Sequence, residues 1–318
     1  MATATARTYD PGLPRAAGQR AARPRTYDPE LLRANRRRRA NIRRAKKFGL
    51  HLLLIGLLFL MLYPVIWMVF SSLRPEAEIF GGLGLIPKTW TLQNYVTGWT
   101  LFGDKTFGLF FINSFIICAL AVIGNVVSCS MAGYAFARLN FRLKWLWFAL
   151  MLGSIMLPIH AQLIPQYIFF LNIGWVNTIL PLVVPKFLAT DAFFVFLMVQ
   201  FMRTLPIELE QAATIDGASY WQRYWRIILP LTLPALVTTA VFTFIFTYND
   251  FFSQLIYLTA IDKMTVPVAL RLFLDPSGGT SSFGGLFAMV LVSIGPVLGF
   301  FLASQRLLVR GIATQGFK

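Results

Sequence analysis

Long apolar runs separated by short polar stretches make up most of this chain. A membrane-spanning helix needs roughly 20 apolar residues to cross about 30 Å of hydrocarbon. Six runs are candidates by that measure, at about 49–70, 109–131, 144–164, 178–201, 231–252 and 287–307. Prolines interrupt the third, fourth and fifth runs, which membrane helices tolerate where neighbouring groups hydrogen-bond the freed carbonyls. These are Pro158, Pro181, Pro185 and Pro234. The pattern predicts an all-α integral membrane protein with six transmembrane helices.

One polar stretch, 204–230, lies between the fourth and fifth runs. Its first half carries the signals of a short helix over about 206–216, namely proline and acidic residues at the start and glycine at the end. The residues concerned are Pro206, Glu208, Glu210 and Gly217. In the second half, Ser219 and Gln222 form a Ser-x-x-Gln capping box, which predicts a second helix. Four residues at helical spacing share one face of that helix, and Pro230 is expected to end it. They are Trp221, Tyr224, Trp225 and Ile228.

The composition excludes an ordinary soluble domain. Hydrophobic residues make up 57% of the 318 residues and charged residues only 13%, with a mean hydropathy of +0.63. A soluble domain of this size could not bury so much apolar surface. Residues 1–47 are the exception, because they are rich in Lys and Arg, and they are expected to form a basic, disordered tail. Residues 48–318 form the predicted transmembrane domain.

The tail also contains a repeat, Arg-Thr-Tyr-Asp-Pro, at 7–11 and again at 25–29. This is either a duplicated partner motif or part of a disordered, low-complexity segment. The net charge of +16 raises the question of nucleic-acid binding. However, no zinc-finger spacing or recognisable nucleic-acid module accompanies it. A basic run just before a first membrane helix is instead expected to fix topology and contact anionic membrane lipid.

The cations gather on one side of the predicted membrane. Outside the tail, that side carries Arg138, Arg142, Lys144, Arg203, Arg223, Arg226, Arg306, Arg310 and Lys318. The opposite loops carry Arg74, Lys88, Lys105, Lys263 and Arg271. Cytoplasmic loops are the ones enriched in Lys and Arg, so both termini and the 204–230 loop are predicted to be cytoplasmic.

The polar loop also carries a recognisable order of residues. It reads Gln211-Ala212-Ala213, three residues, Gly217, nine residues, Ile227, one residue and Leu229-Pro230. This order resembles the EAA loop of the permease subunits of bacterial ABC importers. In that family the loop forms a coupling helix that sits in a cleft of the cytoplasmic ATPase. The resemblance therefore implies the type I ABC importer permease fold, with a coupling helix between spans 4 and 5.

The resemblance also implies which residues couple this chain to an ATPase. They are Glu208, Glu210, Gln211, Ala212, Ala213, Asp216 and Gly217. The motif's glutamate falls on Gln211, so a charge-assisted contact becomes a neutral hydrogen bond, and Glu210 beside it is expected to substitute in part. Gly217 permits a left-handed turn that a side chain would penalise.

Other segments narrow the resemblance to the carbohydrate-uptake branch of the family, and within it to the second permease subunit of maltose-type importers. They are Phe111-Ile112-Asn113-Ser114, Ala135-Phe136-Ala137-Arg138, Leu163-Ile164-Pro165-Gln166-Tyr167, Tyr248-Asn249-Asp250-Phe251-Phe252 and the end from Gln305 to Gly316. The likeness covers about 48–318, although the last residues depart from the family's terminal pattern. It implies a subunit of the bacterial cytoplasmic (inner) membrane that carries a sugar or oligosaccharide.

The partners implied by the family are a second related permease, two ABC ATPase subunits and an extracytoplasmic solute-binding protein. This chain has no Gly-x-x-x-x-Gly-Lys-Ser/Thr loop to hold phosphates. We therefore expect ATP and Mg to bind the partner ATPases and no cofactor to bind here. The chain is predicted to be a transport subunit and not an enzyme.

Polar residues inside predicted spans are candidates for the translocation path, because they are costly in a membrane. We select Asn113, Asn249 and Asp250. The last two either line the path, contact the binding protein, or hydrogen-bond a helix break. Lys186 and Asp191 either pair with each other or face the second permease.

Cysteine and histidine do not suggest a metal site. Cys118 and Cys129 are predicted to be packing residues, because eleven residues of helix separate them by about 16 Å, too far for a disulfide. His51 and His160 are the only histidines and lie far apart in sequence.

Two other functions stay open. One is an ABC importer permease for another solute, such as a glycerol-phosphate diester or a peptide, which a strongly electropositive path would favour. The other is a membrane-embedded enzyme, which would need a clustered acid/base or metal constellation.

Overall fold

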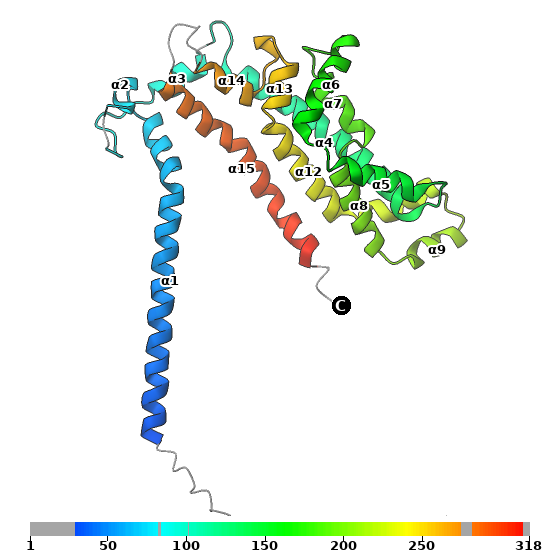
Figure 1. The fold of residues 1–318 in the computed structure, drawn as a ribbon, viewed down its shortest axis with the longest axis horizontal. Coiled ribbons are helices and arrows are strands. Elements are labelled where there is room, and N and C mark those ends of the chain that lie inside the picture. The colour runs from blue at the N-terminus through cyan, green and yellow to red at the C-terminus, as the bar shows by residue number, and fades with distance from the viewer. Residues whose placement is uncertain (1–28, 82–83, 101, 275–281, 314–318) are drawn as a thin grey trace, which may run out of the picture. The chain divides into compact units, whose positions relative to one another are not determined.

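The structure is a computed structural model that describes residues 29–81, 84–100, 102–274 and 282–313, and it is helical throughout (Figure 1). Over those residues there are no strands, only an isolated bridge between Phe102 and Lys105. The all-α prediction is confirmed. The chain divides into two compact units, 1–63 and 64–318.

The first unit is built on α1, Pro29–Ser72, whose last residues belong to the second unit. Its helix starts well before the predicted span, so residues 29–47 are helical where disorder was expected. The reason is local, because Arg, Ala, Leu and Lys are good helix formers. The Arg-Thr-Tyr-Asp-Pro repeats lie outside the described residues, apart from Pro29 at the start of α1.

The second unit is built around α4, Phe107–Arg138, which packs against α8, Ala192–Thr204, and α12, Leu233–Tyr248. The long α15, Phe283–Ala313, packs in turn on α12 (Figure 1). Gly133 lets α4 approach α8 closely. A Cβ atom at Gly133 would lie 2.5 Å from Cβ of Met198, so a larger residue would force the two helices apart. Buried Asn125 joins α4 to α12 by donating from Nδ2 to Oγ1 of Thr243 at 2.8 Å.

Shorter elements complete this unit. They are α2 (Glu76–Ile79), α3 (Gln93–Thr100), α5 (Lys144–Ser154), α6 (Ile159–Asn172), α7 (Leu180–Val183), η1 (Val184–Leu188), α9 (Glu208–Ile215), α10 (Tyr220–Arg223), η2 (Tyr224–Ile228), α11 (Leu229–Leu231), α13 (Phe252–Tyr257), η3 (Ile261–Lys263) and α14 (Val266–Leu272).

Within the described residues, four helical segments are long and apolar enough to cross a membrane. They are Ile42–Ser72, Phe107–Arg138, Leu180–Thr204 and Phe283–Gln305. A fifth is counted if Tyr220–Leu231 and Leu233–Tyr248, bent by 76°, form one span. The predicted count of six is not confirmed, because 144–164 forms two shorter helices, α5 and α6. Pro158 separates them, since the residue before a proline is kept out of the helical region.

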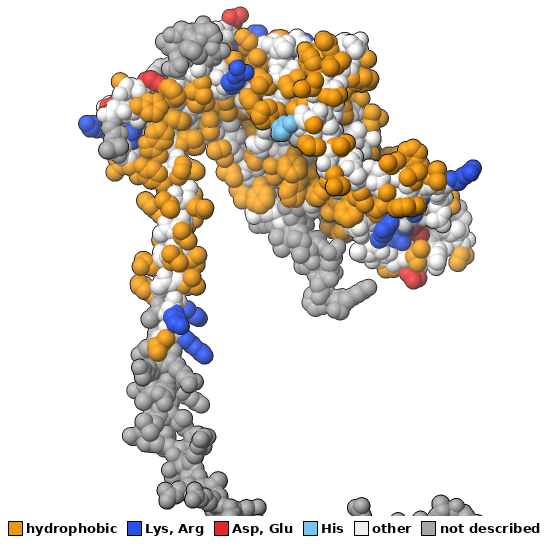
Figure 2. Space-filling view, in the orientation of Figure 1, with side chains coloured by type: hydrophobic (Ala, Val, Ile, Leu, Met, Phe, Trp, Pro, Cys, Tyr) orange, Lys and Arg blue, Asp and Glu red, His pale blue; other side chains and the backbone are white. Residues whose placement is uncertain are grey.

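Apolar side chains cover most of the visible surface in Figure 2, and charged side chains gather in a few places, among them the region of α9. Many of the exposed large hydrophobic residues lie on α1, α4 and α15. This distribution fits elements that face hydrocarbon or other helices in a membrane.

Candidate functional site

The predicted polar loop forms a helical hairpin over 206–231, here called the EAA hairpin. Its first helix, α9, spans Glu208–Ile215, within the predicted 206–216, and carries Glu208 and Glu210 in its first turn. Acidic side chains there stabilise the unpaired amide groups of a helix start. The hairpin therefore begins as the sequence predicted.

Gly217 ends α9 in the way its position predicted. Its φ is +79°, in the left-handed region that glycine adopts at low cost. The amide of Gly217 donates to the carbonyl of Thr214 at 3.0 Å, and the amide of Ala218 donates to that of Ala213 at 2.9 Å. These two bonds are a Schellman motif, which satisfies the last carbonyls of the helix and reverses the chain sharply.

The second helix starts with the predicted capping box. The Gln222 amide donates to Oγ of Ser219 at 3.3 Å, and the Ser219 amide donates to Oε1 of Gln222 at 2.8 Å. Pro230 does not end this helix, which continues as η2, a π-helix, and α11 as far as Leu231. A widened turn before a proline accommodates its ring and missing donor. The chain bends at Thr232 instead.

The four residues predicted to share one face of this helix differ in burial. Tyr224 and Ile228 are buried, but the side chains predicted to lie beside them, Trp221 and Trp225, are 56% and 42% exposed. The three aromatic rings still touch, with centroids 5.3 to 5.7 Å apart. The contacts among the three rings agree with the predicted shared face, of which only Tyr224 and Ile228 are buried.

Two opposite faces of α9 have different roles. Glu208, Gln211 and Ala212 are exposed, as are Asp216 and Gly217 at its end, whereas Glu210 and Ala213 are buried. Most of the predicted coupling residues therefore lie on the accessible side of the hairpin. Ala213 packs inward rather than toward a partner.

Glu210 faces its own chain. Its Oε1 lies 3.0 Å from Nε of Arg138, and the two side chains are only 8% and 7% exposed. The two atoms are not aligned for a hydrogen bond, so the contact is an attraction between charges. Oε2 of Glu210 accepts a hydrogen bond from the Tyr134 hydroxyl at 3.2 Å. We expected Glu210 to take over part of the role of the motif's glutamate. That prediction is wrong, because the Glu210 carboxylate points away from the exposed face of α9.

Arg138 and Ser130, both on α4, hold further parts of this region. Nη2 of Arg138 donates to the carbonyls of Met202 and Leu205, at the end of α8, at 2.6 Å each. The hydroxyl groups of Ser130 and Tyr224 lie 2.7 Å apart. The EAA hairpin is thus attached to α4 by side chains as well as to α8 by the backbone.

The path candidate Asn113 is already hydrogen-bonded within the chain. Its Nδ2 donates to the carbonyls of Asp262 and Met264, at 2.9 Å each. The neighbouring Ser114 hydroxyl accepts from the amide of Val266 at 2.9 Å. Both side chains fix the segment that leads into α14.

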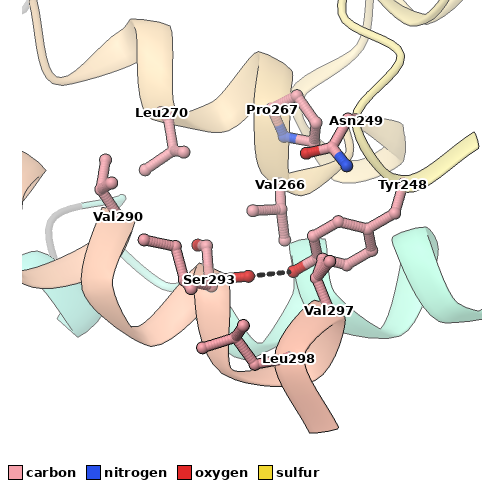
Figure 3. Close-up of a pocket in the computed structure, with 10 residues that line it drawn as sticks. Tyr248, Asn249, Val266, Pro267, Leu270, Val290, Ser293, Val297 and Leu298 are labelled. Atoms are coloured by element: carbon pink, nitrogen blue, oxygen red, sulfur yellow. Dashed lines mark hydrogen bonds between the residues drawn. The ribbon is translucent and has the colours of Figure 1, made fainter. Parts of the chain in front are cut away.

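Asp250 and Asn249 lie together at the end of α12 and differ in role. Oδ1 of Asp250 accepts from the amide of Ser253 at 3.1 Å, at the start of α13, which is the helix-break role left open by the sequence. Asn249 is exposed and donates to the carbonyl of Ile245 at 2.8 Å. It also lines an open pocket of about 250 Å³ between α12, α14 and α15 (Figure 3).

The pocket wall is mainly apolar. The Tyr248 hydroxyl donates to the carbonyl of Ser293 at 3.1 Å across it (Figure 3). The other lining residues are Asn249, Val266, Pro267, Leu270, Val290, Ile294, Val297 and Leu298. No lysine or arginine is among them. Sequence reasoning selected Asn249 but not the rest of the wall, because apolar residues of a pocket and of a core look alike in sequence.

Other polar residues of the spans have structural partners. Lys186 and Asp191 form an ion pair at 2.7 Å, the first of the two alternatives. Gln254, which the sequence reasoning missed, is buried and bonded to the carbonyl of Thr247 at 2.7 Å and to the Thr265 hydroxyl. Cys118 and Cys129 are free and buried, as expected of packing residues.

Comparison with known proteins agrees with this architecture. The family model described as binding-protein-dependent transport system inner membrane component matches residues 124–314. The chain belongs to this family. It is a multi-pass membrane protein of the inner-membrane permease class, the transport subunit of an ABC importer and not an enzyme, and it works with ATPase and solute-binding partners.

Individual relatives extend over most of the chain. The trehalose/maltose transport system permease protein MalG of Thermococcus litoralis is 33% identical, covering 84% of this chain and 96% of its own length. The sn-glycerol-3-phosphate transport system permease protein UgpE of Salmonella typhi is 29% identical, over 85% and 97%. A solved bacterial ABC transporter involved in alginate import has a chain of the same fold, with a TM-score of 0.70 at 20% identity, covering 86% and 97%.

Proposed function

We propose that this chain is the permease subunit of an ATP-driven importer that carries a sugar or oligosaccharide delivered by an extracytoplasmic binding protein. The exposed face of α9 binds a cytoplasmic ATPase, and both termini are cytoplasmic. A second related permease completes the membrane path, and two ATPase subunits hold ATP and Mg. The anionic lipid of the inner leaflet contacts the basic start of α1.

The observation that carries this proposal is the geometry of the EAA hairpin. Its outer face presents Gln211 and Ala212, small or uncharged side chains that allow close approach by a partner surface. Its inner face is fixed to α4 and α8. A rigid segment with one free face can transfer motion from a partner to the bundle.

The pocket at Asn249 supports a sugar over a phosphorylated solute. A phosphate group is recognised by Arg, Lys or clustered amide groups, and the pocket wall has none of these cations. Similarity to the trehalose/maltose transport system permease, at 33% identity over 84% of this chain, supports a sugar cargo. A carbohydrate is therefore the favoured cargo, and glycerol-phosphate compounds are the alternative.

The test uses two variants of the assembled transporter, each with one added cysteine. Ala212→Cys on α9 should cross-link to the ATPase and resist a membrane-impermeant maleimide in intact cells. Gln93→Cys on α3, exposed and predicted to lie outside the cell, should show the reverse. Native Cys118 and Cys129 are 1% and 0% exposed, so their background reaction is low.

Reaction of Ala212→Cys from outside the cell, or the absence of any ATPase cross-link, would overturn the coupling proposal. In proteoliposomes that contain the whole transporter, labelled neutral disaccharides should be imported with ATP. Import of sn-glycerol 3-phosphate but of no sugar would replace the proposed cargo with the alternative.

A further inference from the structure

A buried ion pair joins the EAA hairpin to α4. Glu210 lies on the inner face of α9, and Arg138 is the last residue of α4. The backbone connects α9 to α8 instead, through residues 205–207. The pair therefore makes a second connection, to a helix distant in sequence.

This connection involves charges that are almost fully removed from water. The two side chains are 7% and 8% exposed, and charges are seldom buried without a partner. Replacing a buried pair with well-packed apolar residues is often neutral or stabilising, so the pair is weak evidence for a stabilising role. Its value lies in fixing one geometry, because either charge left alone in this position would be strongly unfavourable.

Arg138 is suited to join three elements. Its guanidinium stays charged and offers five donors in a rigid plane. Nη2 donates to the carbonyls of Met202 and Leu205 at the end of α8, and the Met202 carbonyl also accepts from the backbone amide of Leu205 at 3.3 Å. Nε faces Glu210 on α9. The ends of α4 and α8 and the inner face of α9 are thus held around one side chain.

Tyr134 supports the same arrangement one helical turn earlier on α4. Its hydroxyl donates to Glu210, and its ring lies 5.3 Å from that of Tyr224 in the second helix of the hairpin. Both halves of the hairpin therefore contact the last turns of α4.

We propose that Arg138 and Glu210 are positioning residues that make α9 and the ends of α4 and α8 move as one body, so that displacement of α9 by the ATPase is delivered directly to α4. This inference rests on the proposed function, because it assumes that an ATPase binds the exposed face of α9. Without the pair, α9 still binds the ATPase, but its motion reaches the bundle through the backbone on either side of the hairpin and through the Ser130–Tyr224 contact, with no ion pair that links α9 directly to α4.

The test measures transport and ATP hydrolysis together in proteoliposomes that contain the whole transporter. Glu210→Gln removes the charge and keeps the size of the side chain. The amount of solute imported per ATP hydrolysed should fall by about tenfold, a typical size for coupling between sites, while ATPase assembly and hydrolysis persist. Glu210→Asp, which keeps the charge, should restore much of the ratio.

Asp191→Asn is the matched control, because it breaks the other ion pair of the second unit's described residues, with Lys186, and leaves the hairpin intact. Its ratio of solute to ATP should equal that of the unchanged protein. If Glu210→Gln fails to assemble, Tyr134→Phe removes only one hydroxyl that contacts the same carboxylate, and it should lower the ratio to a smaller extent.

The outcomes separate the two proposals. An unchanged solute-to-ATP ratio in Glu210→Gln and Tyr134→Phe, with Ala212→Cys still cross-linked to the ATPase, would overturn the role of the ion pair alone. An absent cross-link would overturn the docking of α9. An equal fall of the ratio in Asp191→Asn would show a general loss of stability and would also overturn the positioning role.

Discussion

Two regions of the molecule differ in where their hydrogen-bonding groups point. One is the EAA hairpin, and the other is the group of polar residues near the start of α4 and the end of α12, away from the hairpin. On α9, Gln211 faces solvent, and Glu210 turns inward to the bundle. At the other region, Asn113 and Asp250 bond the backbone of their own chain, and Asn249 is the exposed member. A polar residue can recognise a partner only with groups that its own fold leaves free.

This difference teaches that polarity in an apolar chain is a weak guide to a transport path. Irregular backbone within a membrane must find hydrogen bonds inside the protein. Asn113 supplies two of them to the turn before α14. The hairpin is predicted to lie in water, so its outer face is free to bind a partner.

The largest expected effect is at the turn that shapes the hairpin. Gly217→Val should reduce uptake by at least about tenfold, because a side chain in the left-handed region costs about 1–2 kcal/mol, more for a β-branched residue, and about 1.4 kcal/mol is tenfold in an equilibrium. The cause is backbone strain alone, since a Cβ atom there would meet nothing within 4 Å. Uptake per inserted copy measures it.

Gly217→Asn is the matched control, because asparagine tolerates the left-handed conformation and ends many helices. Its uptake should stay close to that of the unchanged protein. Normal uptake by Gly217→Val would show that the hairpin geometry does not matter for coupling, and the contrast between the two regions would then lose its functional meaning.

An intermediate effect is expected at Asn113. Asn113→Leu should lower stability by about 1–3 kcal/mol, because two carbonyls lose their donor, while the solute concentration for half-maximal uptake stays the same. Thermal unfolding in detergent and uptake kinetics measure the two quantities. Asn249→Leu should instead leave stability unchanged and alter the solute concentration for half-maximal uptake, since Asn249 lines the pocket and, among the described residues, its side chain bonds only to the Ile245 carbonyl of its own helix. If Asn113→Leu left stability unchanged but altered solute affinity, Asn113 would be assigned to the translocation path instead.

The smallest effect is expected at Gln211. Gln211→Glu should leave assembly and uptake within about twofold, because the side chain is exposed and a negative charge near a helix start is favourable by about 0.3–1 kcal/mol. Co-purification with the ATPase and uptake measure it. Loss of assembly would mean that the partner's cleft is adapted to a neutral group.

Local features of the fold could be predicted from the sequence. The capping box of Ser219 and Gln222 and the turn at Gly217 depend on contacts between residues a few positions apart. Such contacts are fixed by residue type and spacing. The apolar runs likewise predicted the long helices, because length and hydropathy are properties of the chain itself.

Other features of the fold were not predicted by the local sequence signals. The sequence near Pro230 did not show that η2 would widen and let the helix continue to Leu231. The division of 144–164 into α5 and α6 follows from Pro158, which the sequence revealed, but membrane helices can also tolerate a proline.

By itself, the sequence determined that this is a helical membrane protein with a polar hairpin between two apolar runs, because those properties arise from residue type and short-range spacing. Only the tertiary structure decided that Glu210 faces inward, to Tyr134, 76 residues away, and to Arg138, and that Asn113 bonds a carbonyl 151 residues away. The direction of a polar side chain is set by which partner the fold brings within hydrogen-bonding distance, and that partner cannot be identified from neighbouring residues.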